Sequence, residues 1–503
     1  MRPNSATTEP TGPRRGAALG PAALAAALGL VHVALYWGTG PIDDDYIVQR
    51  YAANLLAGHG FVFNPGGEAA EGFTSPLWLA VALVLHTSGA AGDGAVKVLG
   101  GLALALAAAV GAQLGAARAT GRQRWLAAWP GYATAASPAL AYHAVAGLGT
   151  LPLAAALLAF GAAWVRAERL GRPPWAAGWW LAVAALLRQE AALLWLPFCA
   201  AGLRRRQLGP LAPALLALLG WTAARFVWFG RLDPVTHAVK RLPLAAELEY
   251  GLLYFADATR DAALGWLALA ALIVLLRRSA GAAWRGLAAG FWLHTLYVVA
   301  VGGDWMPLAR FAAPVLPLGF SLAGEAIGAR RRWPLALAAF VGLLAPQAGQ
   351  LQRAQVLFDR QFFEARWLAL GAHFREAAPG ARVALSPIGA FGYASRLTIV
   401  DLLGLTHTGL LHVAPDLDRV RLKGHHRHDK ELVLCDPPEH VLLGNAVLQP
   451  DTGRLAVNPW EQDLVLDPRF RERYVQVRAV IDGAAAEWFR RRDVAPLAGE
   501  VPR

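Results

Sequence analysis

The sequence predicts an α-helical polytopic membrane protein with about eleven transmembrane helices, followed by a C-terminal α/β domain outside the membrane. Hydrophobic residues make up 56% of the 503 residues and charged residues only 16%, with a mean hydropathy of +0.37. An ordinary soluble domain has about 25% charged residues. The deficit is confined to a series of Ala/Leu/Val runs before residue 350. We therefore expect a transmembrane domain over residues 1–349 and a soluble domain over 350–503.

The net charge of +12 lies largely in short arginine clusters between the apolar runs, such as residues 204–206 and 330–332. Cytoplasmic loops of membrane proteins carry this excess of Lys and Arg. The pattern therefore argues against a nucleic-acid partner and predicts a multi-pass protein of the inner (plasma) membrane. Its N-terminus is expected in the cytoplasm, and the loop over 39–75 and the C-terminal domain on the periplasmic face. Cys199 and Cys435 fall in different predicted domains, so no disulfide framework is expected.

The apolar runs are assigned as crossings in chain order. The run over 17–37 is too long for a signal-peptide core and is followed by no small-residue cleavage motif, so it is the first transmembrane helix. Further single crossings are expected over 76–89, 96–116, 151–165, 211–229, 264–276, 287–301, 315–327 and 335–344. The stretch 118–150 is left open between a re-entrant pair and an outside segment.

One apolar run, residues 175–202, is interrupted by Arg188, Gln189 and Glu190 and has basic residues on both sides. Basic residues at both ends require an even number of crossings. We therefore expect two short helices with Arg188 and Glu190 at the outer turn. A single long helix with an internal Arg–Glu pair is the alternative.

The soluble part has the pattern of a small α/β domain. A helical pattern over 361–377 ends at Pro379 and Gly380. Runs typical of β-strands follow over 383–385, 397–400, 441–443 and 474–481. The order of these strands in a sheet does not follow from the sequence.

The predicted outer loop begins with three adjacent carboxylates, Asp43, Asp44 and Asp45. Apolar residues then recur at every fourth position, at Ile47, Tyr51 and Leu55. This spacing predicts an amphipathic helix at the membrane surface. One or two acids would satisfy the helix dipole and its cap, whereas three repel one another and raise at least one pKa toward that of a general base. A structural role and a catalytic role both remain open on these residues alone.

Several motifs together resemble a known family. The loop contains D-D-D-Y-I at 43–47, G-F-V-F-N-P-G at 60–66 and E-G-F-T-S-P-L-W at 71–78. These segments resemble the first periplasmic loop of GT-C glycosyltransferases of the terminal β-(1→2)-arabinofuranosyltransferase family. Further similar blocks lie at 188–190, 225–230, 234–240, 302–307, 310–317, 401–406 and 424–425, so the resemblance extends over about residues 43–430. Gln189, Val235 and Gly149 depart from the family pattern, and Gly149 stands where the family has a glutamate.

The resemblance implies a GT-C fold and a transfer of sugar, arabinofuranose in the family, from a polyprenyl-phosphate carrier. The acceptor is a cell-envelope glycan, a glycolipid or a protein at the periplasmic face, and the configuration is inverted. Asp44 is then the general base, with Asp43 orienting the acceptor or replacing Asp44. Arg188, Lys240 and Arg310 are expected to bind the phosphate of the donor. The other expected substrate-binding residues are Tyr46, Glu71, Glu190, Asp304 and Trp305.

No metal ligands and no cofactor are assigned, although the sequence leaves a divalent cation open. The segment 425–429 is rich in histidine, but its spacing favours a solvated loop over a metal site. The alternative functions are a lipid-linked-sugar transporter or flippase, and a GT-C relative that uses aminoarabinose or mannose.

Overall fold

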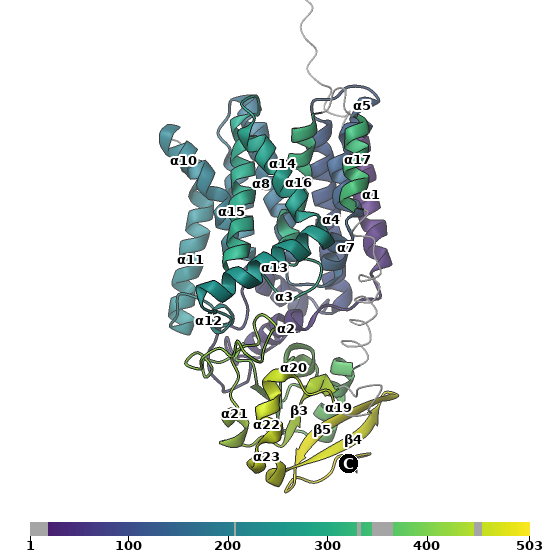
Figure 1. The fold of residues 1–503 in the computed structure, drawn as a ribbon, viewed down its shortest axis with the longest axis vertical. Coiled ribbons are helices and arrows are strands. Elements are labelled where there is room, and N and C mark those ends of the chain that lie inside the picture. Colours follow the sequence, from purple (N-terminus) through teal and green to yellow (C-terminus); the bar gives the residue numbers. More distant parts are fainter. Residues whose placement is uncertain (1–18, 206–207, 329–332, 345–365, 447–454) are drawn as a thin grey trace, which may run out of the picture.

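The computed structural model describes residues 19–205, 208–328, 333–344, 366–446 and 455–503. A helical bundle forms one end of an elongated molecule, and a domain with a β-sheet forms the other (Figure 1). The N-terminal basic segment, the arginines of 330–332, the start of the expected helix over 361–377 and the boundary at 349–350 lie outside the described residues.

Apolar helices build the bundle. Their bounds are α1 (Leu19–Leu35), α4 (Asp93–Ala116), α6 (Trp129–Ala136), α7 (Pro138–Val145), α8 (Thr150–Leu170), α9 (Trp175–Leu187), α10 (Leu196–Arg205), α11 (Ala212–Phe229), α14 (Leu264–Leu276), α15 (Ala282–Ala300), α16 (Leu316–Ile327) and α17 (Trp333–Leu344). Many large apolar side chains on these helices are exposed, including Leu216 and Leu276. Helices that are apolar all round are typical of a membrane environment.

By length and composition, three described helical segments can cross a membrane: α4, α8 and Gly209–Phe229. A fourth is possible if α13 (Leu244–Ala262) and α14, which meet at 94°, form one broken span. Four shorter apolar helices accompany them, at Leu19–Leu35, Pro76–Thr87, Trp175–Leu187 and Ala313–Ile327. The helical part is therefore compatible with membrane insertion, but the expected eleven crossings are not confirmed.

Two expected segments of the bundle need correction. Both ends of α3 (Pro76–Thr87) lie against α2 (Asp43–Leu56), because Trp78 hydrogen-bonds to Asp45 and His86 to Gln49. The crossing expected over 76–89 is therefore wrong: α3 runs beside α2 at one end of the bundle (Figure 1).

The second correction concerns residues 118–150, which contain α5 (Gln123–Ala127), α6 and α7. Gly131 of α6 contacts the late part of α4 near Ala108, and Ala144 of α7 contacts Gly100 in the early part of α4. Together α6 and α7 therefore run lengthwise along α4. This stretch is neither a re-entrant pair nor an outside segment.

The break predicted at Arg188 is confirmed. Helix α9 ends at Leu187, Arg188 has an extended backbone, and the 3-10 helix η1 (Gln189–Trp195) leads into α10. This geometry excludes the single long helix and leaves the Arg188 and Glu190 side chains at a turn.

The C-terminal domain contains a six-stranded mixed sheet of order β2-β1-β3-β5-β4-β6. Strands β1 (Arg382–Leu385), β2 (Thr398–Asp401) and β3 (His440–Leu442) are parallel, and β4 (Tyr474–Ile481), β5 (Ala484–Arg491) and β6 (Val501–Pro502) add antiparallel. The four predicted strands are thus confirmed. Strand β5 was missed because it starts with three alanines and ends with two arginines, without the usual β-branched residues.

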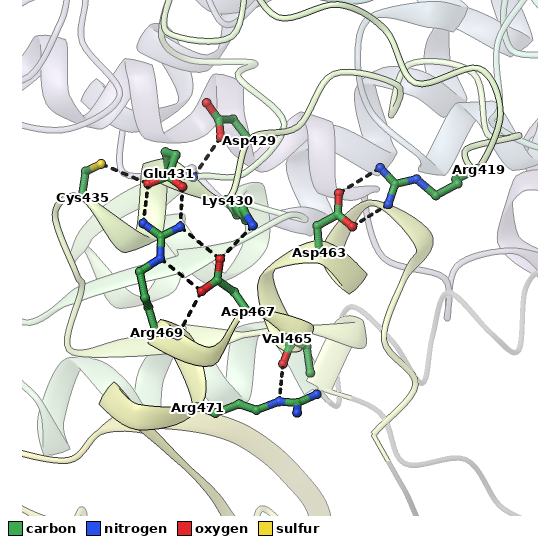
Figure 2. Close-up of polar contacts among 10 residues, drawn as sticks. All are labelled: Arg419, Asp429, Lys430, Glu431, Cys435, Asp463, Val465, Asp467, Arg469 and Arg471. Atoms are coloured by element: carbon green, nitrogen blue, oxygen red, sulfur yellow. Dashed lines mark hydrogen bonds and ion pairs between the residues drawn. The ribbon is translucent and has the colours of Figure 1, made fainter.

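Short helices surround this sheet: α19 (Ala369–Ala377), α20 (Gly389–Ser395), α21 (Glu431–Leu434), α22 (Gln462–Leu466) and α23 (Pro468–Arg473). An ion-pair network joins α21 to α23, as Figure 2 shows. Arg469 contacts Glu431 at 2.6 Å and Asp467 at 3.0 Å, and Lys430 contacts Asp467 at 2.8 Å. The network fixes loop geometry far from the bundle.

The soluble domain contacts the bundle mainly through α2 and the loop after it. Arg50 is only 4% exposed and donates to the carbonyl oxygens of Phe63, Gly392 and Leu397 at 2.6–2.7 Å. Asn64 exchanges two hydrogen bonds with the backbone of Ile399, at 2.8 and 2.9 Å. Arg50 and the loop after α2 therefore contact α20 and the amino-terminal half of β2, which is the edge strand of the sheet.

Candidate active site

A cavity of about 890 Å³ lies where the helical part meets the soluble domain. Its wall includes Asp44 at the start of α2, the turn at Arg188, the segment around α12 (Val235–Val239) and the loop before η3 (Ala313–Val315). Leu405 and Lys423 add a wall from the soluble domain. This volume is large enough for a small-molecule ligand.

Asp44 is held at this cavity by one ion pair. Its Oδ2 accepts a hydrogen bond from Arg310 Nη1 at 3.0 Å, and the Asp44 side chain keeps 24% of its surface exposed. Within the described residues, no hydrogen bond reaches its other oxygen, Oδ1. A positioned carboxylate with one open oxygen can accept a proton.

The three adjacent aspartates have different environments. Burial raises the pKa of Asp44, but Lys240 and Arg310 outweigh burial and hold this pKa below its ordinary value. Burial raises the pKa of Asp43 to about 7. A raised pKa was expected from repulsion among the three acids, but burial is the larger cause of the raised pKa of Asp43. Asp44, the expected base, is instead the residue whose pKa is lowered.

A tight loop places Arg310 beside Asp44. Asp304 accepts two hydrogen bonds from Arg310, at 2.5 and 2.9 Å, which leaves Arg310 Nη1 directed at Asp44. Gly302 and Gly303 both have positive φ, and a Cβ on Gly303 would lie 2.3 Å from the Tyr254 ring. Only glycine fits this approach without distortion.

Two further predicted cations line the same cavity. Lys240 forms no direct ion pair with any described carboxylate and acts on Asp44 from a longer distance, so a ligand can approach its ammonium group. Arg188 pairs with Glu190 at 3.4 Å, and its guanidinium lies 4.9 Å from the centre of the Phe311 ring. The structure therefore brings together six of the predicted site residues: Asp44, Arg188, Glu190, Lys240, Asp304 and Arg310.

Four predicted site residues are not among those that line the cavity. Asp43 accepts hydrogen bonds at 2.8 Å from the backbone N–H groups of Gly389 and Ala390, at the start of α20. Tyr46 donates to Asp93 at 3.0 Å, and Glu71 forms a buried ion pair with Arg225. Trp305 is 42% exposed, and its ring contacts that of His425.

Sequence reasoning missed several residues at this cavity. Lys423 enters it from the soluble domain and forms a buried ion pair with Glu247 of α13. His425 lies close enough to interact electrostatically with Asp44, and burial lowers the pKa of His425 to about 4. The only sequence signal was that Gly424 and His425 belong to a family-like block, which gave no indication of their neighbours.

The departure at Gly149 has a backbone cause. Gly147, Leu148 and Gly149 all have positive φ, and Leu148 donates its N–H to Asp45 at 2.9 Å. A side chain at Gly149 would start 3.1 Å from Leu187 and 3.4 Å from Trp78. In this conformation the position disfavours the glutamate of the family.

The histidine-rich segment 425–429 has structural contacts. His426 hydrogen-bonds to Tyr250 at 3.1 Å, and Arg427 donates to the carbonyl oxygens of Val239 and Arg241. Within the described residues, no group of three His, Cys, Asp or Glu side chains is placed to hold a metal ion. The segment fastens the soluble domain to α12 and α13.

Comparison with known proteins adds one match. A family model for a domain of unknown function, DUF8728, matches residues 350–490, which is less than a third of the chain and falls within the soluble part. No curated protein matches the chain.

Proposed function

We propose that this protein is a membrane glycosyltransferase of GT-C type that transfers a sugar from a polyprenyl-phosphate carrier to an acceptor hydroxyl. The single observation that carries the proposal is the placement of Asp44, with one open oxygen, in a cavity that also contains Arg310, Lys240 and Arg188. Base and cations are the two kinds of group that this reaction needs. Arabinofuranose, the periplasmic site and the envelope acceptor rest on the resemblance of the sequence motifs.

In the proposed reaction, Oδ1 of Asp44 takes up a proton while Oδ2 stays hydrogen-bonded to Arg310. The acceptor hydroxyl gives its proton to Asp44 Oδ1 while its oxygen forms the new bond to the anomeric carbon. The bond from that carbon to the carrier phosphate breaks, and the configuration inverts. Lys240 and Arg310 together keep Asp44 ionised, as the lowered pKa of Asp44 indicates.

The cations support the departure of the phosphate. Lys240 has no carboxylate partner among the described residues, so it can neutralise a leaving phosphate without breaking an ion pair. Arg310 and Arg188 both lie near the Phe311 ring, with guanidinium carbons 5.2 and 4.9 Å from the ring centre. Each contact to a phosphate would be charge-assisted and stronger than a neutral hydrogen bond.

The apolar part of the cavity supports a lipid-linked donor. Ala192, Leu193 and Leu196 line it from η1 and α10, and Ala300 and Val301 from the end of α15. These residues belong to the helices that carry the apolar surface of the bundle. A prenyl chain could therefore leave the cavity along the bundle while the sugar stays beside Asp44.

The test is turnover of the purified protein with polyprenyl-phosphate sugars. Asp44→Asn keeps the shape but cannot take the proton, so turnover should fall by roughly 10²–10⁴-fold while donor binding persists. The matched control is Asp257→Asn on α13, an exposed aspartate that lines no described cavity and pairs only with Arg260. Transfer at the parental rate by Asp44→Asn would exclude this base.

Asp45 makes a poor control, although its position varies in the family-like motif. It is 1% exposed and accepts hydrogen bonds from Trp78, Leu148 and Gln49. Asp45→Asn would therefore leave buried donors unpaired and affect folding. A transporter or flippase, the alternative class, predicts that Asp44→Asn changes carrier movement while no sugar transfer occurs in either protein.

A further inference from the structure

A second cavity lies at the other end of the bundle. Its volume is about 200 Å³, and it is bordered by the end of α4, the turn between α14 and α15, and the end of α16. We call it the arginine cavity; its lining includes Arg118, Arg277, Ser279, Trp284, Ser321 and Glu325.

The arginine cavity is remote from Asp44. Helix α4 starts at Asp93, which binds Tyr46 of α2, and it ends at Ala116 beside the arginine cavity. Its 24 residues correspond to a length of roughly 36 Å. The arginine cavity therefore lies about one membrane thickness from the candidate active site.

The rim of the arginine cavity has more positive than negative charge. Arg118 pairs with Glu325 at 2.9 Å, so these two charges cancel. Arg277 donates only to the carbonyl oxygens of Glu325 and Ala326, at 3.4 and 3.2 Å, and no described carboxylate neutralises it. Arg169 lies close enough to interact electrostatically with Arg118 and Glu325. The rim can therefore accept an anion.

A hydroxyl is a further polar group at the rim of the arginine cavity. Ser279 lies two residues after Arg277 and is exposed, and its side chain can donate a hydrogen bond to an anion. Trp284 of α15 closes the inner wall: it is 2% exposed, and its indole N–H is buried out of reach of a ligand.

We propose that the arginine cavity binds the phosphate of an anionic membrane lipid, with Arg277 and the Ser279 hydroxyl as its contacts. An arginine rim at the end of apolar helices matches a phosphate whose acyl chains run along the bundle. Basic pockets between membrane helices recognise lipid headgroups in this way. The proposal requires membrane insertion but is independent of sugar transfer.

The test measures lipid-dependent stabilisation of the purified full-length protein in an uncharged detergent. Added phosphatidylglycerol should raise the unfolding temperature and stay bound in native mass spectrometry. Arg277→Gln removes the charge, and Ser279→Ala removes only the hydroxyl. Arg277→Gln should weaken the apparent lipid affinity roughly tenfold, the effect of losing one charge-assisted contact. Ser279→Ala should weaken it less, by roughly threefold, the effect of losing one neutral hydrogen bond.

The controls separate the site from general charge effects and from free phosphate. Arg278→Gln changes the neighbouring arginine, which does not line the arginine cavity, and should respond to phosphatidylglycerol like the parent. Phosphatidylcholine and inorganic phosphate should stabilise all variants much less. Equal lipid responses of parent, Arg277→Gln and Ser279→Ala would overturn the proposal, and so would inorganic phosphate acting as well as the lipid.

Discussion

The two aspartates at the start of α2 show how neighbouring residues acquire different roles. Asp44 faces the cavity and the guanidinium of Arg310, whereas Asp43 is turned to the backbone of α20. Both oxygens of Asp43 accept a backbone N–H, and Asp43 is not among the residues that line the cavity. Asp43 therefore joins the soluble domain to α2, and Asp44 remains the only one of the pair in the cavity.

The pH dependence of turnover distinguishes these two carboxylates as bases. The pKa of Asp44 lies below its ordinary value, so Asp44 is ionised throughout the range above pH 5. With Asp44 as the base, kcat/KM should show no acid limb near neutrality. With Asp43 as the base, whose pKa is about 7, kcat/KM should fall about tenfold per pH unit below 7. An acid limb centred near pH 7 would contradict the assignment to Asp44.

Glu71 gives a second prediction at this scale. The Glu71–Arg225 pair is buried, with side chains 2% and 1% exposed, and it joins the loop after α2 to α11. Glu71→Gln leaves Arg225 charged and without its carboxylate partner. The free energy of unfolding should therefore fall by about 3–5 kcal/mol. Thermal or denaturant unfolding in detergent measures this loss.

Kinetics separate this structural role of Glu71 from the substrate-binding role that the sequence suggested. The fraction of Glu71→Gln that remains folded should keep the parental KM for the donor. A raised KM at unchanged stability would restore Glu71 to the substrate site.

Among the elements, the loop over residues 301–312 depends most on its backbone. It turns sharply after α15 and brings Asp304 and Arg310 to the cavity, with positive φ at Gly302, Gly303, Leu308 and Ala309. Left-handed conformations at non-glycine residues are costly and cluster at functional sites. The strained backbone at Leu308 and Ala309 lies directly before Arg310 and therefore helps to set the position of its side chain.

Gly303→Ala tests this loop against a matched control. Gly303 has φ +64° and lies against Tyr254, whereas Gly66 has φ +73° and open space around it. Gly66→Ala should lower the free energy of unfolding only by the cost of a left-handed backbone at alanine, about 1–2 kcal/mol. Gly303→Ala should cost clearly more and should lower turnover as well, because the added Cβ displaces the loop. Equal effects of the two changes on stability and activity would show that the contact with Tyr254 is unimportant.

The sequence predicted elements well where the pattern was local. Hydrophobic runs gave the bundle helices, β-branched runs gave strands β1 to β4, and the charged interruption gave the break at Arg188. The sequence prediction failed where only the length of an apolar run indicated a membrane crossing. Helix α3 is apolar enough for a short crossing, but contacts from both of its ends to α2 keep it at one end of the bundle. Such contacts between distant segments are not encoded in periodicity.

At the scale of the whole molecule, the candidate site exists only because two parts of the chain meet. Asp44, Lys240 and Arg310 come from the helical part, while Lys423 comes from a loop of the sheet domain. Motif matching could collect the first three, because each lies in a block with a distinct pattern. It could not find Lys423, whose role depends on the contacts that place the sheet domain against α2 and α13.

The last prediction concerns the sides of the membrane. Direct contacts place the loop after α2 and the sheet domain at one end of the bundle, and α4 carries the chain to Arg118 and Arg277 at the other. Single cysteines at Ala69 and Val480, both exposed, should therefore react with an impermeant maleimide from the same side of intact cells.

The control for this labelling is a cysteine in place of the exposed Arg278, between α14 and α15, which should react only after permeabilisation. Cys199 and Cys435 are first replaced by serine, because Cys435 is exposed. Arginine-rich loops favour the cytoplasm, so the expected outer positions are Ala69 and Val480. Labelling of only one of these two from outside would place α2 and the sheet domain on opposite sides of the membrane. That result would contradict the contacts that Arg50 and Asn64 make with the sheet domain.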